Sequence, residues 1–394
     1  MNRILLYTEN YVGGGGNKYL ADIVNSVSEN YEVFLVSNIN GLSEVDFSLI
    51  NREYTHQQID IYAFNRIDGI FVNFKKLFPL IYKIFRKIYF YLFLFYYQNK
   101  NIKILSSVID DIDPFLVISC NGGYPAALSC LDLIFACKKK AKKCILTIVS
   151  MPQKKSFIDI FYKEIGTLVD RVIVNSNLIK DSLVAGRKFI KENISVIYNS
   201  VGNSDSVAWD FSKKSEEILL GYVGRIERSK GSYILLDAFK NIGKYENVRL
   251  LMVGSGPELD DVKEYSKKLG LDNKVIFTGY LSNNIYSILS MIDIFVFPSL
   301  WEGFPYSILE AMNAGKIIVS TNVGGIPEAI TDKKEGILVN PRDVIKLSNV
   351  LEDIILNFDR YSYLGLNAKQ KIDKNFRFDN FREKIVNLIK SFNN

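Results

Sequence analysis

The sequence predicts an α/β protein built from two doubly wound domains that face each other across a cleft. Short β-branched runs alternate with helical stretches along the chain, which is typical of parallel sheets covered on both faces. The alternation weakens once, near the middle, and then restarts, so that two similar halves follow one another. The length of 394 residues, with 48% hydrophobic and 23% charged residues, fits two globular domains.

The first half, residues 1–198, is expected to form the amino-terminal domain. Its first strand, 4–8, leads into the glycine run 13–16 and then into a helix over 17–28. Further strands of buried type are predicted at 33–37, 115–119, 144–149 and 171–175.

Residues 199–217 are rich in turn formers and are predicted to be the linker. The second domain is expected over 218–378. Its strands are predicted at 219–223, 248–253, 275–278, 294–298, 317–320 and 336–339. A last helix, about 379–391, closes the chain, and this terminal stretch (379–394) can pack back on the first domain.

The positive charge of the chain is local. Lysine and arginine exceed aspartate and glutamate by 49 − 43, which gives +6. The segment 69–109 alone holds seven basic residues and no acidic one. Because the excess is confined in this way, we expect no nucleic-acid partner.

No metal site is predicted. The four cysteines lack paired metal-ligand spacing and are expected to be buried, reduced thiols of a cytoplasmic protein (Cys120, Cys130, Cys137, Cys144). The single histidine, His56, lies in a polar stretch and is expected at the surface. The one Asp-x-Asp, Asp111 to Asp113, is expected at an exposed helix end. We also expect neither a signal peptide nor a membrane-spanning helix.

Glycine loops follow several predicted strands. The run that contains Gly14 and Gly15 opens the first helix, where backbone N–H groups can meet an anion. Its spacing fits neither a dinucleotide fingerprint nor a P-loop, so a tight turn and a ligand loop remain equally open. In the second half, Gly254 and Gly256 form another strand-to-helix turn.

Charged residues in the second half suit the phosphate and hydroxyl groups of a ligand. Arg225 and Lys230 lie in one loop after a strand, and this pair suits a diphosphate. Ordinary surface charges in a loop would give the same sequence pattern. Glu302 and Glu310 bracket Gly303, Phe304 and Pro305, and two carboxylates there suit hydroxyl recognition. Pro305 is typical of the first turn of a helix.

Together these motifs resemble the family 4 nucleotide-sugar glycosyltransferases, which have the GT-B fold of two Rossmann-like domains. The resemblance rests on the amino-terminal glycine loop, Gly-Arg-x4-Lys-Gly, Val-Gly-x-Gly-Pro and Glu-Gly-Phe-Pro-x4-Glu. Asn199-Ser200-Val201 and the stretch from Gly324 to Glu328 fit the same pattern. The match is strong over about 199–341 and loose before it.

The resemblance implies a role for each matching residue. Arg225 and Lys230 would hold the donor diphosphate and stabilise the leaving group, a charge effect that fixed cations supply well. Glu302, with the amides of Gly303 and Phe304, would bind hydroxyls of the donor sugar, and Glu310 would bind the ribose. Gly14 and Gly15 would lie close to the diphosphate from the opposite, acceptor-side domain, and Gly254, Gly256 and Pro305 would contribute to donor binding. The donor would be a UDP- or GDP-sugar, and neither a metal nor another cofactor is expected.

One departure from the family concerns a histidine that often follows an amino-domain strand and contacts the donor sugar. Here the expected places hold Asn121 and Ser150, which can donate a hydrogen bond to a sugar oxygen but carry no charge. A catalytically silent sugar-nucleotide-binding scaffold therefore stays open as an alternative. A sugar-nucleotide epimerase of the same fold is a second alternative.

The segment 70–97 is basic and strongly aromatic, and Pro79 is predicted to start a helix there. Lys83, Arg86 and Lys87 fall on one helical face. Such a helix suits an anionic membrane surface, the other interpretation being core and protein contacts. Lys138 to Lys143 and Lys154-Lys155 are expected to add positive charge to the same half. The expected partners are thus a glycan or lipid-linked acceptor and the inner face of the cell membrane, where the chain would be peripheral.

Overall fold

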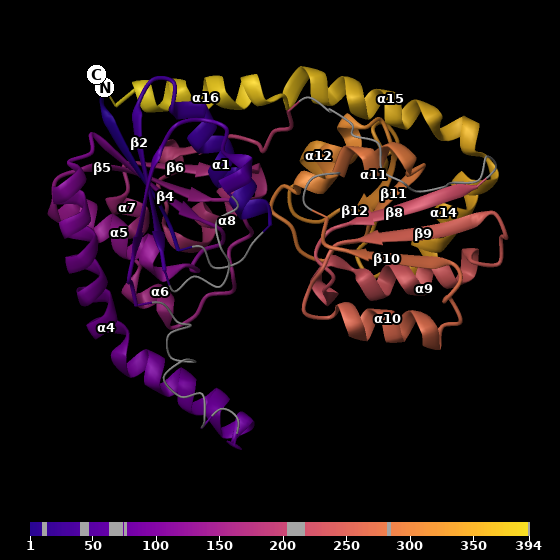
Figure 1. Cartoon of the computed structure of the whole chain (residues 1–394), viewed down its shortest axis with the longest axis horizontal. Coiled ribbons are helices and arrows are strands. Elements are labelled where there is room, and N and C mark those ends of the chain that lie inside the picture. The colour runs from indigo at the N-terminus through magenta and orange to yellow at the C-terminus, as the bar shows by residue number, and fades with distance from the viewer. Residues whose placement is uncertain are drawn as a thin grey trace. The chain divides into compact units, whose positions relative to one another are not determined.

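The computed structural model describes residues 1–9, 14–39, 47–62, 74, 77–202, 217–281 and 285–392. The chain divides into two units, one of Met1–Tyr198 with Phe381–Asn394 and one of Asn199–Asn380 (Figure 1). Only 199–202 and 217 of the predicted linker lie within the described residues. Each unit is a parallel sheet with helices on its faces, as predicted.

The first unit contains a seven-stranded parallel sheet in the order β3-β2-β1-β4-β5-β6-β7. Its strands are β1 (Arg3–Thr8), β2 (Glu32–Asn38), β3 (Thr55–Ile59), β4 (Leu116–Asn121), β5 (Lys143–Ile148), β6 (Arg171–Val174) and β7 (Ile194–Val196). Its helices are α1 (Gly15–Val27), α4 (Pro79–Ile112), α5 (Leu128–Lys139), α6 (Ile158–Phe161), α7 (Ile165–Leu168) and α8 (Asn177–Arg187), with 3₁₀ turns at Phe47–Leu49 and Lys191–Asn193.

The second unit contains a six-stranded parallel sheet in the order β10-β9-β8-β11-β12-β13. Its strands are β8 (Ile218–Val223), β9 (Val248–Val253), β10 (Val275–Gly279), β11 (Ile294–Phe297), β12 (Ile317–Thr321) and β13 (Ile337–Val339). Its helices are α9 (Ser232–Ile242), α10 (Leu259–Lys268), α11 (Ile285–Met291), α12 (Tyr306–Asn313), α13 (Ile326–Ala329), α14 (Val344–Leu356) and α15 (Phe358–Asn375), with a 3₁₀ turn at Arg228–Lys230.

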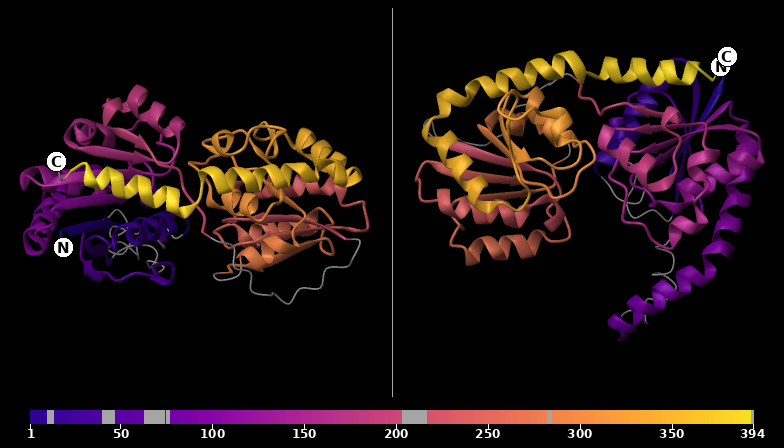
Figure 2. Two further views of the ribbon diagram at one scale, coloured as in Figure 1. Left: turned by 90° about the horizontal axis from the view of Figure 1, so that it is seen from above. Right: turned by 180° about the vertical axis from the view of Figure 1, so that it is seen from behind.

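The last helix, α16 (Phe378–Lys390), begins in the second unit, and its larger part belongs to the first. Its Phe381 ring packs edge-on against Tyr19 of α1 at 5.7 Å between ring centres. Arg382 forms an ion pair with Glu29. Figure 2 shows α16 as one continuous ribbon at the end of the chain.

Two strands were not predicted. The edge strand β3 pairs only with β2, and its sequence Thr-His-Gln-Gln-Ile is mostly exposed, so it carries no apolar pattern. His56 therefore lies in a strand, with its Nε2 2.9 Å from Ser37 Oγ. The strand β7, at the other edge, is only three residues long.

Expectations about the surface and the cysteines hold with small changes. Asp111 and Asp113 are exposed at the end of α4, where Lys142 pairs with Asp113 and lowers its pKa. All four cysteines are free, but Cys120 is partly exposed rather than buried. Within the described ranges, no helix combines the length and the apolar character needed to cross a bilayer.

The core of the first unit encloses a carboxyl group. Asp132 of α5 is buried and accepts hydrogen bonds from Asn101 Nδ2 and Tyr162 Oη, each at 2.8 Å. Burial, with a smaller contribution from the charge of Glu9, raises the pKa of Asp132 to about 8. The group therefore keeps its proton in the native protein at neutral pH.

Replacing Asp132 with asparagine is expected to weaken the pH dependence of stability. The unfolded carboxyl ionises near pH 4, whereas the folded one releases its proton only at about pH 8, so the native state binds more protons in between. The free energy of unfolding of the parent should fall as pH rises through this window, and the Asp132→Asn variant should lose that part of the slope. Urea titrations of both proteins across the window measure it, and parallel slopes would contradict the assignment.

Candidate active site

The two loops that carry the charged motifs follow neighbouring strands of the second sheet. β8 and β11 lie side by side where the strand order reverses, with β9 and β10 on one flank and β12 and β13 on the other. The loop 224–230 follows β8, and the loop 298–305 follows β11. In doubly wound sheets, ligands bind beyond the carboxyl ends of the strands at this switch point. The motifs therefore lie at the expected ligand edge of the sheet.

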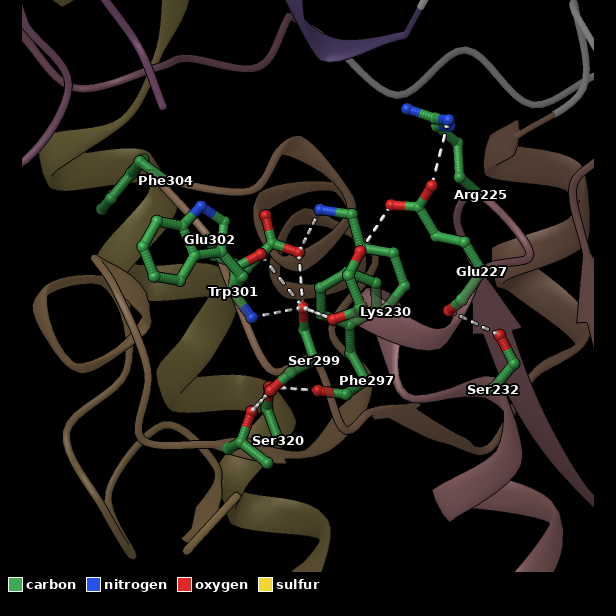
Figure 3. Close-up of polar contacts among 12 residues, drawn as sticks. Arg225, Glu227, Lys230, Ser232, Phe297, Ser299, Trp301, Glu302, Phe304 and Ser320 are labelled. Atoms are coloured by element: carbon green, nitrogen blue, oxygen red, sulfur yellow. Dashed lines mark hydrogen bonds and ion pairs between the residues drawn. The ribbon is translucent and has the colours of Figure 1, made fainter. Parts of the chain in front are cut away.

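Lys230 and Glu302 meet across these loops. Lys230 Nζ lies 2.6 Å from Glu302 Oε1, with 22% and 8% of the two side chains exposed. The buried hydroxyl of Ser299 donates to the same oxygen at 2.8 Å (Figure 3). Among the described residues, no hydrogen bond to Oε2 is found, so this oxygen can accept one from a ligand. The result is a fixed carboxylate beside a fixed cation.

Arg225 is held by a different carboxylate. Its guanidinium lies 3.0 Å from Glu227 Oε2, and its side chain is 43% exposed. The other oxygen of Glu227 accepts from Ser229 Oγ at 2.5 Å. Figure 3 shows Lys230 turned toward Glu302 and Arg225 turned toward Glu227. Both predicted cations thus share one loop, but only Lys230 contacts Glu302.

The end of β12 supports the loop that bears Glu302. Thr321 Oγ1 donates to the carbonyl of Ser299 at 2.5 Å, and the amide of Gly325 donates to the carbonyl of Gly303 at 2.6 Å. Gly324 has φ of 56°, and a Cβ there would lie 2.0 Å from the carbonyl oxygen of Glu302. This close approach requires glycine and fixes the backbone of Glu302.

The glycines of the third motif pack against the Arg225 loop. Gly254 has φ of 136°, and a Cβ on it would lie 2.0 Å from the carbonyl oxygen of Gly224. A Cβ on Gly256 would lie 2.3 Å from the carbonyl oxygen of Ile226. These glycines thus let two loops approach closely, and their predicted donor contact stays a prediction.

The rest of the predicted carboxylate motif lies in and before α12. Phe304 is buried against Phe376 at 5.4 Å between ring centres, and its carbonyl accepts from Asn199 Nδ2 at 2.5 Å. Pro305 immediately precedes the first residue of α12. Glu310 is buried in the second turn of that helix, eight residues after Glu302.

In the first unit, the glycine run leads into α1, with Gly14 at the N-cap and Gly15 as the first residue of the helix. Gly14 and Gly15 are exposed, and the carbonyl of Gly14 accepts from the amide of Asn17 at 3.0 Å. Gly13 lies outside the described residues. Their contact with a diphosphate stays a prediction.

The two polar residues at the histidine positions lie at and just beyond the ends of neighbouring strands. Asn121 is the last residue of β4 and pairs with Ile148 of β5, two residues before Ser150. Asn121 is 1% exposed, and neither side-chain polar atom has a hydrogen-bond partner among the described residues. Because unpaired buried amides are costly, this side chain fits a ligand contact.

A residue near Asn121 escaped the sequence analysis. Glu9 follows β1 directly and is buried, and its Oε2 accepts from the amide and the hydroxyl of Ser129 at 3.0 and 2.7 Å. Burial raises the pKa of Glu9. β1 and β4 are neighbours in the sheet, so Glu9 and Asn121 lie at the same edge.

Nothing in the described part of the chain resembles a metal centre, because no three His, Cys, Asp or Glu side chains gather there. The positive charge at the second-unit site comes instead from Lys230 and Arg225.

The architecture defines the class of protein. The crystal structure of HepE from Anabaena in complex with UDP and glucose is similar over 99% of this chain and 100% of HepE, with a TM-score of 0.75 and 18% identity. The chain therefore has the GT-B fold, with two Rossmann-like domains, as predicted.

A family model matches the sequence of the second unit. The match, to the group 1 glycosyl transferases, covers residues 204–371. An uncharacterized glycosyltransferase of Methanocaldococcus jannaschii is 26% identical over 56% of this chain and 60% of its own length. The capsular polysaccharide biosynthesis glycosyltransferase CapM of Staphylococcus aureus is 25% identical over 56% of this chain and 58% of its own length. The chain thus spans about three fifths of the length of these two curated relatives.

Proposed function

We propose that the chain is a retaining glycosyltransferase of family 4 that moves a hexose-type sugar from a UDP- or GDP-sugar to a glycan or lipid-linked acceptor. The observation that carries the proposal is the Lys230–Glu302 pair of 2.6 Å at the switch point of the second sheet. The UDP and glucose bound to HepE support the choice of a nucleotide-sugar donor.

The geometry fits the charge changes of such a reaction. As the glycosidic bond breaks, negative charge grows on the diphosphate oxygen that leaves. Lys230 is a point charge already held in place, and Arg225 offers a planar fork that can leave Glu227 for a phosphate. These two cations would stabilise the leaving group without a metal ion.

The carboxylates would recognise hydroxyl groups. Glu302 keeps Oε2 available for a donor-sugar hydroxyl, and the amides of Gly303 and Phe304 would add donors beside it. Glu310 would bind the ribose. In the first unit, Asn121 has an unpaired amide that can contact a sugar oxygen, and Ser150 offers a hydroxyl near it. Transfer on the face from which the diphosphate leaves retains the anomeric configuration and needs no covalent enzyme intermediate.

The proposed setting is surface polysaccharide or lipopolysaccharide synthesis at the cytoplasmic face of the cell membrane. The relationship to CapM, a capsular polysaccharide glycosyltransferase, supports this pathway. The basic and apolar helix α4 supports membrane contact through the segment 70–97. The chain would act there as a peripheral protein.

A donor screen followed by a transfer assay tests the proposed function. A bound donor should raise the melting temperature of the protein, so UDP- and GDP-sugars are compared in a thermal-shift screen. The stabilising donor, labelled in its sugar, should then label a membrane extract, and NMR of the product should show the anomeric configuration of the donor. EDTA should leave the rate unchanged.

The same experiment separates the alternatives. Donor binding without transfer over the full panel would instead establish a silent scaffold, and recovery of an epimerised free donor would establish an epimerase. Absence of any thermal shift would overturn the donor site itself.

A further inference from the structure

The first half of α4 exposes a row of aliphatic side chains. Leu80, Ile84, Ile88 and Leu92 recur at every fourth residue and are 54–76% exposed. Aromatic side chains are exposed on this helix as well, with Phe95 at 65% and Tyr96 at 57%, while the rings of Tyr89 and Phe93 lie 4.5 Å apart in a tilted arrangement. Figure 1 shows this half of α4 extending beyond the sheet of its own unit.

The short helix α6 packs beside α4 and continues its exposed apolar surface. Ile158 and Phe161 point inward and pack against Phe90 and Leu94 of α4. Phe157 and Ile160 point outward and are 51% and 58% exposed. The ring of Phe157 also meets Tyr91 of α4 edge-on, at 5.3 Å between ring centres. The two exposed apolar surfaces are therefore continuous.

Exposed positive charge borders this surface. Lys154 and Lys155 are exposed and lie three and two residues before Phe157, and Lys87 is exposed on α4. The one acidic residue of the segment 154–160, Asp159, forms an ion pair with Arg187, whose Nε lies 2.8 Å from Asp159 Oδ1.

The other lysines of this half do not contribute in the same way. Lys140, Lys142 and Lys143 pair with Asp110, Asp113 and Asp170. The positive charges of these three lysines are therefore partly offset by their carboxylate partners.

We propose that residues 154–160 form a second membrane-contacting element beside α4, with Phe157 and Ile160 entering the lipid interface and Lys154 and Lys155 binding anionic headgroups. The inference rests on the proposed membrane association of α4. Apolar side chains bordered by lysines suit an anionic bilayer, because the side chains can enter the lipid interface while the lysines bind the negative headgroups. A second copy of the chain would instead bring like charges together.

The test measures flotation of the full chain with vesicles of phosphatidylcholine, with and without phosphatidylglycerol. The parent should float with the anionic vesicles, and salt should weaken the binding. The double variant Phe157→Ser/Ile160→Ser should bind at least about tenfold more weakly, since each change removes apolar area that would be buried in the lipid interface. The control Ile345→Ser alters an aliphatic residue on α14 that is even more exposed, at 73%, and should bind like the parent.

The charges are tested in parallel. Lys154→Glu/Lys155→Glu should abolish the preference for anionic vesicles, whereas Lys267→Glu on α10 should keep it. If the parent floats and both double variants float equally well, the second element is refuted while the α4 association stands. If the parent does not float, the membrane association fails as well, independently of the donor screen. A parent dimer that Phe157→Ser/Ile160→Ser dissociates, without vesicle binding, would reassign the surface to self-association.

Discussion

The Lys230→Ala variant is expected to transfer sugar about two to three orders of magnitude more slowly than the parent. The change removes the cation 2.6 Å from Glu302 Oε1 and leaves that carboxylate, 8% exposed, with only the hydroxyl of Ser299. A buried carboxylate without its charge partner is costly and can reorient. The variant therefore loses both leaving-group stabilisation and the placement of Glu302. The measurement is kcat/KM for the donor found in the screen, with circular dichroism to verify folding.

Two comparisons make this result specific. Lys267→Ala removes an exposed lysine of α10 and should retain the parental rate. Glu302→Gln should lower the rate as well, and the double variant should cost less than the sum of the two single changes, because the residues act as a pair. A folded Lys230→Ala protein with the parental rate would refute the assignment of the site.

The sequence predicted most of the fold because buried parallel strands have a strong signature. All six strands of the second sheet were placed from apolar runs such as Val248–Val253. The signature fails at edges, where a strand such as Thr55–Ile59 has one neighbour and exposed polar side chains. The three-residue strand Ile194–Val196 is too short to carry any pattern.

At the site, the sequence could name residues but not their pairing. The motifs gave Lys230 and Glu302, yet their separation of 72 positions hides a contact that arises only because β8 and β11 are neighbours. Glu227 and Ser299 were missed, since a carboxylate or a hydroxyl in a loop carries no pattern of its own. Their proximity to Arg225 and Glu302 in the chain was the available signal.

The surface proposed to contact the membrane shows the same limit. The positive charge of the segment 69–109 can be read from its composition. Phe157 and Ile160 become part of the same surface only because α6 packs on α4. Ion pairing also needs structure, because the lysines at 140, 142 and 143 appear free until their aspartate partners are placed.

The Gly324→Ala variant is expected to lose about 3 kcal/mol of stability and about a hundredfold in transfer rate. Gly324 has φ of 56°, and the added methyl group would start 2.0 Å from the carbonyl oxygen of Glu302. Relief of this overlap must move the backbone of Glu302 by about 1 Å, which is enough to misplace a catalytic side chain. Urea unfolding and kcat/KM measure the two effects.

Gly270→Ala is the matched control for this variant, because Gly270 has a similar φ of 73° but nothing lies within 4 Å of the place that its Cβ would take. It should suffer only the left-handed backbone cost of about 1–2 kcal/mol and keep the parental rate. The difference between the two variants thus isolates the contact with Glu302 from backbone strain. Equal rates for Gly324→Ala and Gly270→Ala would mean that the position of Glu302 does not limit transfer, and the role given to its carboxylate would then be wrong.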